Sequence, residues 1–162
     1  MKLRLEASKK YGDLAEERFE SVYHHLVKRR ATKSENKYKH FDFILKDGRT
    51  VDVKTYKKIR PDGYVCIEVI NVYGGIGWCH PLSLVDLIAF ETKEDFVIVR
   101  KQDLLQILPK DISCTIPRQD RMDITKKIDV FTGRSSSQYF DRNKDVFTYK
   151  HFDEILKIKI DL

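Results

Sequence analysis

The chemistry of this chain is concentrated in Asp42 and the tripeptide Asp52-Val53-Lys54. They lie in a stretch whose apolar residues alternate with polar ones, a pattern that predicts two β-strands. Alternate side chains of a strand share a face, so Asp52 and Lys54 project together. Carboxylates beside a lysine can bind a hard divalent cation and stabilise the negative charge of a phosphate.

The turn between the two strands decides whether Asp42 joins this set. A two-residue turn, Asp47-Gly48, would place Asp42 opposite Val53, whereas a three-residue loop that includes Lys46 places it opposite Asp52. The longer loop needs a glycine in the left-handed conformation, and Gly48 supplies it. It also gathers the apolar residues on one buried face. These residues are Phe41, Phe43, Val51 and Val53. The hydrophobic pattern therefore favours a close pair of aspartates.

A close aspartate pair and a basic neighbourhood point to phosphodiester chemistry. Two adjacent carboxylates repel each other, and Mg²⁺ relieves the repulsion; Mn²⁺ can substitute. Lys54 could hold the scissile phosphate, or orient and deprotonate an attacking water. Between Lys28 and Arg60 the chain has twelve basic and four acidic residues, a net charge of +8. This window predicts a polyanionic partner. The candidate contacts to nucleic acid are Lys39, Tyr56, Lys57, Lys58 and Arg60.

The periodicity along the chain predicts an α/β fold, a mixed β-sheet flanked by helices. Residues 5–30 form a predicted helix with its basic residues in the last turn, and 31–37 a loop. Predicted strands follow at 38–45, 49–59, 64–73, 84–91 and 95–100, of which 64–73 is expected to be central. A short helix is expected at 101–108. Residues 110–143 are expected to be irregular, 145–150 a strand, and 152–160 a helix or strand.

Length and composition exclude several classes of protein. The 162 residues suit a single domain, with a core at about 8–108 and a C-terminal extension of uncertain role at 110–162. No apolar run is long enough to span a bilayer, so we expect no membrane partner and a cytoplasmic protein. Three cysteines without a CxxC pair argue against a zinc ribbon or a disulfide framework.

The residues singled out above resemble the PD-(D/E)XK nuclease superfamily, in particular its small phage and bacterial members. That family has an acid at the end of one strand and an acid-x-Lys motif on the next, as in Asp42 and Asp52-Val53-Lys54. Many members carry a helical glutamate four residues after a glycine. Here Gly12 precedes Glu16, with Glu20 in reserve. The resemblance covers about residues 8–108. Phe41 replaces the family's proline, and Asp52 its commoner glutamate.

The resemblance implies a restriction-endonuclease-like fold and a Mg²⁺-dependent deoxyribonuclease. Asp42, Asp52 and the Val53 carbonyl would bind the metal, Glu16 would support it directly or through water, and Lys54 would complete the catalytic set. The substrate would be DNA, with RNA as an alternative, selected by structure or ends. A homodimer would cut two strands, and a phage-encoded chain would act in the host cytoplasm. The replacement of the family's proline by Phe41 and of its glutamate by Asp52 leaves a second interpretation, an inactive nuclease fold that binds nucleic acid or another partner.

Overall fold

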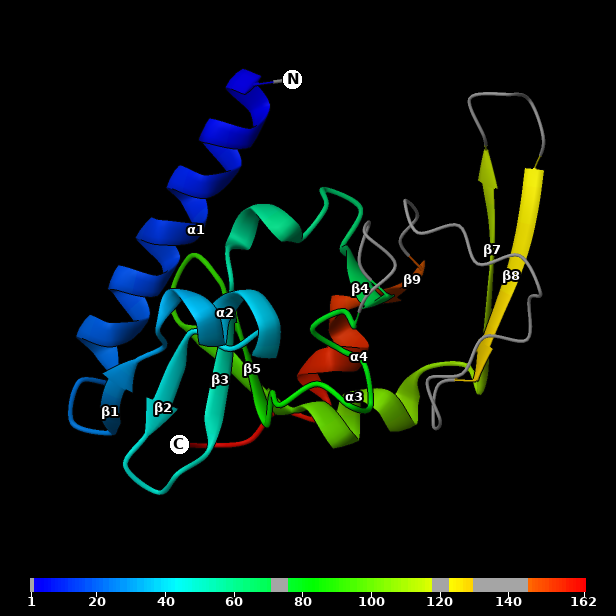
Figure 1. Cartoon of the computed structure of the whole chain (residues 1–162). Helices are drawn as coiled ribbons and strands as arrows, with labels where there is room; N and C mark the ends of the chain where they lie inside the picture. The colour runs from blue at the N-terminus through cyan, green and yellow to red at the C-terminus, as the bar shows by residue number, and fades with distance from the viewer. Residues whose placement is uncertain (1, 71–75, 118–122, 130–145) are drawn as a thin grey trace.

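A five-stranded mixed sheet forms the centre of the computed structural model, which describes residues 2–70, 76–117, 123–129 and 146–162 (Figure 1). The strand order is β1-β2-β3-β5-β6. β3 and β5 are parallel, and the other neighbours are antiparallel. The predicted α/β class with a mixed sheet is confirmed. The strands are β1 (Val27–Arg30), β2 (Phe43–Leu45), β3 (Thr50–Lys54), β5 (Leu87–Glu91) and β6 (Phe96–Arg100).

The β2–β3 hairpin has the predicted register. Phe43 pairs with Val51 and Ile44 with Thr50, as the three-residue loop requires. The loop is closed by a hydrogen bond of 3.0 Å from the Gly48 amide to the Leu45 carbonyl. Gly48 has a φ of +92°, which a residue with a side chain rarely adopts.

The first helix is shorter than predicted at its C-terminal end, and a second helix replaces the predicted loop. α1 ends at Val22, and the basic residues expected in its last turn form β1 instead, because Val27 pairs with Leu45. α2 begins after Thr32, whose side chain and that of Glu35 form a capping box. The helices are α1 (Lys2–Val22), α2 (Lys33–Lys39), the 3₁₀ turn η1 (Tyr56–Lys58), α3 (Lys101–Ile107) and α4 (Phe152–Leu156).

The core divides into two clusters, one on each face of the five-stranded sheet, because successive side chains of a strand point to opposite faces. One cluster joins Ala15 and Phe19 of α1 to Phe43, Val51 and other sheet residues. The second is formed with β4, α3 and α4. Phe41 was expected to share a face with Phe43, but it is packed in the second cluster, since it precedes the first residue of β2.

Two further strand pairs differ from the sequence prediction. β4 (Tyr64–Ile70) pairs with β9 (Val146–His151) and not with the five-stranded sheet, so it is not the expected central strand. β7 (Asp111–Pro117) and β8 (Asp123–Asp129) form a hairpin where irregular chain was expected, and Figure 1 shows it extending from the body of the molecule. The expected mobile loop at 134–137 lies outside the described residues. β9 and α4 belong to the fold proper, because Ile155 is fully buried in the second cluster.

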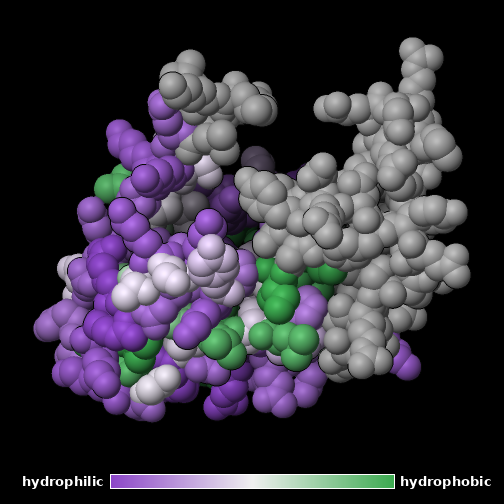
Figure 2. Space-filling model, in the orientation of Figure 1, coloured by the Kyte–Doolittle hydropathy of each residue, from purple (hydrophilic) through white to green (hydrophobic). Residues whose placement is uncertain are grey.

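The surface in the view of Figure 2 is strongly hydrophilic over α1 and the adjoining strands, while hydrophobic residues gather nearer its centre. In the segment that precedes β5, Leu82 and Leu84 are 67% and 55% exposed. None of the helices in the described part of the chain has the length and apolar character needed to cross a membrane.

Candidate active site

A cavity of about 290 Å³ brings together most of the residues that sequence analysis singled out for chemistry. One lining residue comes from α1, and two come from α2 and its C-cap. The central four belong to the β2–β3 hairpin and the residue that precedes it. The remaining two come from β4 and the segment that follows it. The lining residues are Glu16, Asn36, His40, Asp42, Asp52, Val53, Lys54, Glu68 and Trp78.

Asp42 lies just before β2 and is fixed by two hydrogen bonds. Its Oδ1 accepts from the Asn36 side-chain amide at 2.6 Å, and its Oδ2 accepts from the Val53 backbone N–H at 2.7 Å. The N–H and C=O of one strand residue point to the same edge. The Val53 carbonyl therefore faces the end of β2, toward the side on which Asp42 lies. The Asp42 carboxylate and the Val53 carbonyl oxygen therefore face the same region.

Asp52 and Lys54 form a buried ion pair on β3. The Lys54 ammonium lies 2.7 Å from Asp52 Oδ2, and the two side chains are only 18% and 6% exposed. Burial, together with the nearby Asp42, raises the pKa of Asp52 well above its usual value even though Lys54 opposes the shift. Burial lowers the pKa of Lys54, but the attraction of Asp52 and Asp42 outweighs it and raises that pKa overall.

Glu16 approaches the pair from α1. Burial and the charge of Asp42 raise its pKa to about 7, although Arg30, 3.4 Å away, favours the charged form. Glu20, the reserve candidate, does not line the cavity; its carboxylate is 3.0 Å from Arg30 on the surface. Burial and the positive charge of Lys54 lower the pKa of His40. The carboxyl group of Asp42 therefore interacts electrostatically with two others, that of Glu16 and that of Asp52.

Sequence analysis did not place four of the lining residues in the site, namely Asn36, His40, Glu68 and Trp78. Asn36 was placed in a loop, although the capping pattern Thr32-Lys33-Ser34-Glu35 is a recognisable helix start. The Trp78 ring is 4.8 Å from the Lys54 ammonium. The chain at Trp78 is bound to β4 by the Cys79 N–H, which donates to the Glu68 carbonyl at 3.0 Å. Gly77 permits this approach, because a Cβ there would lie 2.8 Å from the same carbonyl. No local pattern indicates such a long-range contact.

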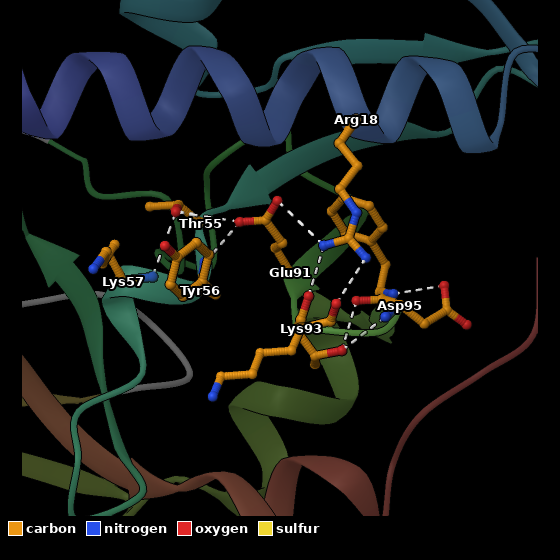
Figure 3. Close-up of polar contacts among 9 residues, drawn as sticks. Arg18, Thr55, Tyr56, Lys57, Glu91, Lys93 and Asp95 are labelled. Carbon is orange, nitrogen blue, oxygen red and sulfur yellow. Dashed lines mark hydrogen bonds and ion pairs between the residues drawn. The ribbon is translucent and has the colours of Figure 1, made fainter.

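A buried carboxylate, Glu91, holds the chain directly after Lys54 in place (Figure 3). Glu91 stands at the end of β5 and accepts hydrogen bonds from the Tyr56 N–H at 3.1 Å and the Thr55 hydroxyl at 3.4 Å. Arg18 of α1 lies 3.5 Å from the other Glu91 oxygen and donates to the Thr92 carbonyl at 2.7 Å. These contacts join α1, the end of β3 and the β5–β6 turn.

The predicted nucleic-acid contacts fall into two groups. Tyr56, Lys57, Lys58 and Arg60 are exposed on and just after η1, which follows Lys54 in the chain. Lys58 also lines a cavity of about 220 Å³ that adjoins the one described above. Lys39 is exposed on α2 but lines a different, larger cavity of about 1030 Å³, so the structure does not bring it to the acid cluster.

The resemblance implies a divalent cation at this cavity. Among the described residues, no three histidine, cysteine or acidic side chains are arranged to hold a metal ion. Mg²⁺, however, is commonly held by one or two carboxylates, with water and phosphate as its other ligands. Asp42 and Asp52 supply two close carboxylates that line the same cavity. These donors fit such a cation.

Searches with the sequence and the structure found no matching family model, curated protein or solved structure.

Proposed function

We propose that this protein is a metal-dependent endonuclease that hydrolyses phosphodiester bonds in DNA, with a restriction-endonuclease-like fold. One observation carries the proposal: two buried aspartates and a lysine converge on one cavity, where the Lys54 ammonium lies 2.7 Å from Asp52 Oδ2. Two close, buried carboxylates repel each other, which is costly for the folded protein, and Lys54 balances only one of the two charges. Their retention is explained if they bind a divalent cation.

The contacts of each residue in the cavity indicate its role in the proposed hydrolysis. Asp42, Asp52 and the Val53 carbonyl would hold Mg²⁺ or Mn²⁺, with Glu16 in support, and the metal would activate water and polarise the phosphate. Asn36 and the Val53 N–H keep Asp42 oriented. Lys54 lies beside Asp52 with its pKa raised by the attraction of the two aspartates, and as an ammonium it would stabilise the phosphate's negative charge.

The proposal is tested by incubating supercoiled, linear, branched and single-stranded DNA with Mg²⁺ or Mn²⁺. We expect the parent protein to cleave, and the variants Lys54→Ala and Asp52→Asn to lose cleavage. Lys46→Ala, an exposed lysine on the β2–β3 loop, is the matched control and should cleave like the parent. Equal cleavage by parent and Lys54→Ala would reveal a contaminating nuclease and remove the assignment. An RNA substrate run in parallel decides between the two nucleic acids.

A second function, an inactive nuclease fold that binds nucleic acid, is favoured by one observation. The Lys54 ammonium occupies the position beside Asp52 Oδ2, at 2.7 Å. Under this alternative the parent and Lys54→Ala would both bind DNA, and neither would cleave it with either metal.

A further inference from the structure

The β4–β9 ribbon has one buried and one solvent-exposed face. Val65, Ile67 and Val69 of β4 are at most 1% exposed and belong to the core. The residues between them point the other way. Residues opposite each other in an antiparallel pair share a face, so three cross-strand pairs line this exposed face. They are Tyr64 with His151, Cys66 with Tyr149, and Glu68 with Phe147.

Aromatic rings dominate this exposed face, which we call the aromatic track. The Phe147 and Tyr149 rings are 5.4 Å apart, and the Tyr64 and His151 rings are 5.1 Å apart. Tyr149 is 44% and Tyr64 42% exposed. The Arg60 guanidinium lies 5.0 Å from the centre of the Tyr149 ring. Partly exposed aromatic side chains on a strand pair, opposite the packed face of β4, suggest a binding surface.

The track leads to the candidate active site. Its inner residues Cys66 and Glu68 line the cavity of about 220 Å³ together with Lys54, Lys58 and Trp78. Glu68, Lys54 and Trp78 also line the cavity that holds the aspartates. A molecule bound along the track would therefore stay in contact with the protein surface as far as Lys54.

We propose that the aromatic track binds an unpaired nucleic-acid strand and guides it to the cavity; the guiding step rests on the function proposed above. Aromatic side chains stack with bases irrespective of sequence, and Arg adds a cation–π contact. Lys58 and Arg60 stand beside the track and complement phosphates. A duplex hides its base faces in its own stack, so aromatic side chains at this surface suit an unpaired strand and not a paired one.

Binding is tested without cleavage, by fluorescence anisotropy in EDTA. The probe is a labelled oligothymidylate of about 12 nucleotides, a length within the range bound by stacking domains. Tyr149→Ala should weaken binding roughly 5- to 100-fold, and Tyr149→Phe, which keeps the ring, should not. Tyr149→Thr keeps a good strand former without the ring, so it serves if the alanine variant does not fold. Tyr38→Ala is the control, because Tyr38 is 69% exposed on α2 and lies outside the track.

Arg60 has a closely matched control in Arg49. Arg60 pairs with Asp62 at 2.8 Å and Arg49 with Asp47 at 2.8 Å, and both arginines belong to turns. Arg60→Ala should weaken binding and Arg49→Ala should not. Competition with unlabelled oligouridylate decides whether RNA uses the same track. Equal competition by a duplex, or displacement by polyglutamate, would overturn the proposal, as would unchanged binding by both ring-removing Tyr149 variants.

The two proposals fail in distinguishable ways. Oligothymidylate binding that depends on Tyr149, without cleavage in Mg²⁺ or Mn²⁺, would overturn the nuclease function and support the track as a binding site. Cleavage that depends on Lys54, with binding indifferent to Tyr149, would overturn the track alone.

Discussion

At the scale of single residues, Glu16 makes the stability of the protein depend on pH. Its pKa is raised from 4.5 to about 7 in the folded state, so the folded protein binds more protons than the unfolded chain in this window. The contribution of Glu16 to the unfolding free energy therefore falls as pH rises from about 4.5 to 7. The shift corresponds to at most about 3 kcal/mol, and solvent around the partly exposed side chain reduces this, so Glu16→Gln should stabilise the protein at pH 8 by about 1–3 kcal/mol and leave it unchanged at pH 4. Urea unfolding at both pH values measures this, with exposed Glu17→Gln as control; an equal difference at both pH values would contradict it.

Asn36 is predicted to act on the proposed cleavage through Asp42. Asn36→Ala removes the 2.6 Å hydrogen bond to Asp42 Oδ1 and leaves that carboxylate less firmly oriented. Loss of a residue that orients a metal-binding group typically costs 10- to 100-fold, and we expect a fall of about that size in cleavage rate with oligonucleotide binding retained. Lys37→Ala, on an adjacent exposed position of α2, should change neither quantity. A parallel loss of binding and cleavage would show that Asn36 has another role.

At the scale of secondary structure, the capping box decides whether α2 forms. The Thr32 hydroxyl accepts from the Glu35 N–H at 3.1 Å, and the Glu35 carboxylate accepts from the Thr32 N–H at 2.9 Å. Thr32→Ala should lower the unfolding free energy by about 1 kcal/mol, measured by urea unfolding. Because α2 carries Asn36, this variant should also slow the proposed cleavage. Exposed Ser34→Ala is the control, and equal losses in the two variants would contradict a capping role.

Glu91 is predicted to stabilise the junction between β3 and η1. Glu91→Ala removes the acceptor for the Tyr56 N–H and the ionic partner of Arg18. Buried donors left without an acceptor cost about 1–3 kcal/mol each, so we expect a loss of roughly 2–3 kcal/mol in thermal or urea unfolding. Exposed Glu94→Ala, in the adjacent turn, should have little effect. A loss below about 0.5 kcal/mol would show that water replaces Glu91.

Local patterns predicted those elements whose partners are near in sequence. The β2–β3 hairpin could be predicted together with its register, because Gly48 and the alternating apolar residues agree on one loop length. The helical period of α1 was extended too far, since the turn that follows Val22 has no proline or glycine to mark it. The composition of β4 is that of a central strand, yet its partner is β9, about 80 residues away. Such pairing is set by the whole fold.

At the scale of the whole molecule, the charge distribution predicts salt-dependent binding of nucleic acid. Each phosphate contact to a single strand contributes about −0.7 to the slope of log K against log salt concentration. Lys58→Ala should make this slope less negative by about 0.7 in titrations with oligothymidylate, and Arg60→Ala should do so as well. Lys33→Ala, an exposed lysine at the start of α2, should leave the slope unchanged. A slope that is equal in all variants would show that these residues do not contact phosphate.

The candidate site itself was only partly foreseeable at this scale. Asp42, Asp52, Val53 and Lys54 could be placed together because one hairpin holds them all. Glu16 followed from family resemblance, and its approach from α1 required the packing of Phe19 against Phe43. Trp78 reaches the cavity through the Gly77 contact with β4, which depends on the arrangement of the whole chain.

The two outer strands of the five-stranded sheet also bear on self-association. β1 carries three exposed basic residues in succession and a bulge, and its counterpart at the far edge, β6, is bridged at Ile98 by Ile160. Charged, irregular or covered edges hinder the addition of a foreign strand. Arg29 and Arg30 are already paired with Glu35 and Glu20, so a strand added along β1 would have to displace these side chains. Edge-to-edge aggregation through β1 is therefore disfavoured.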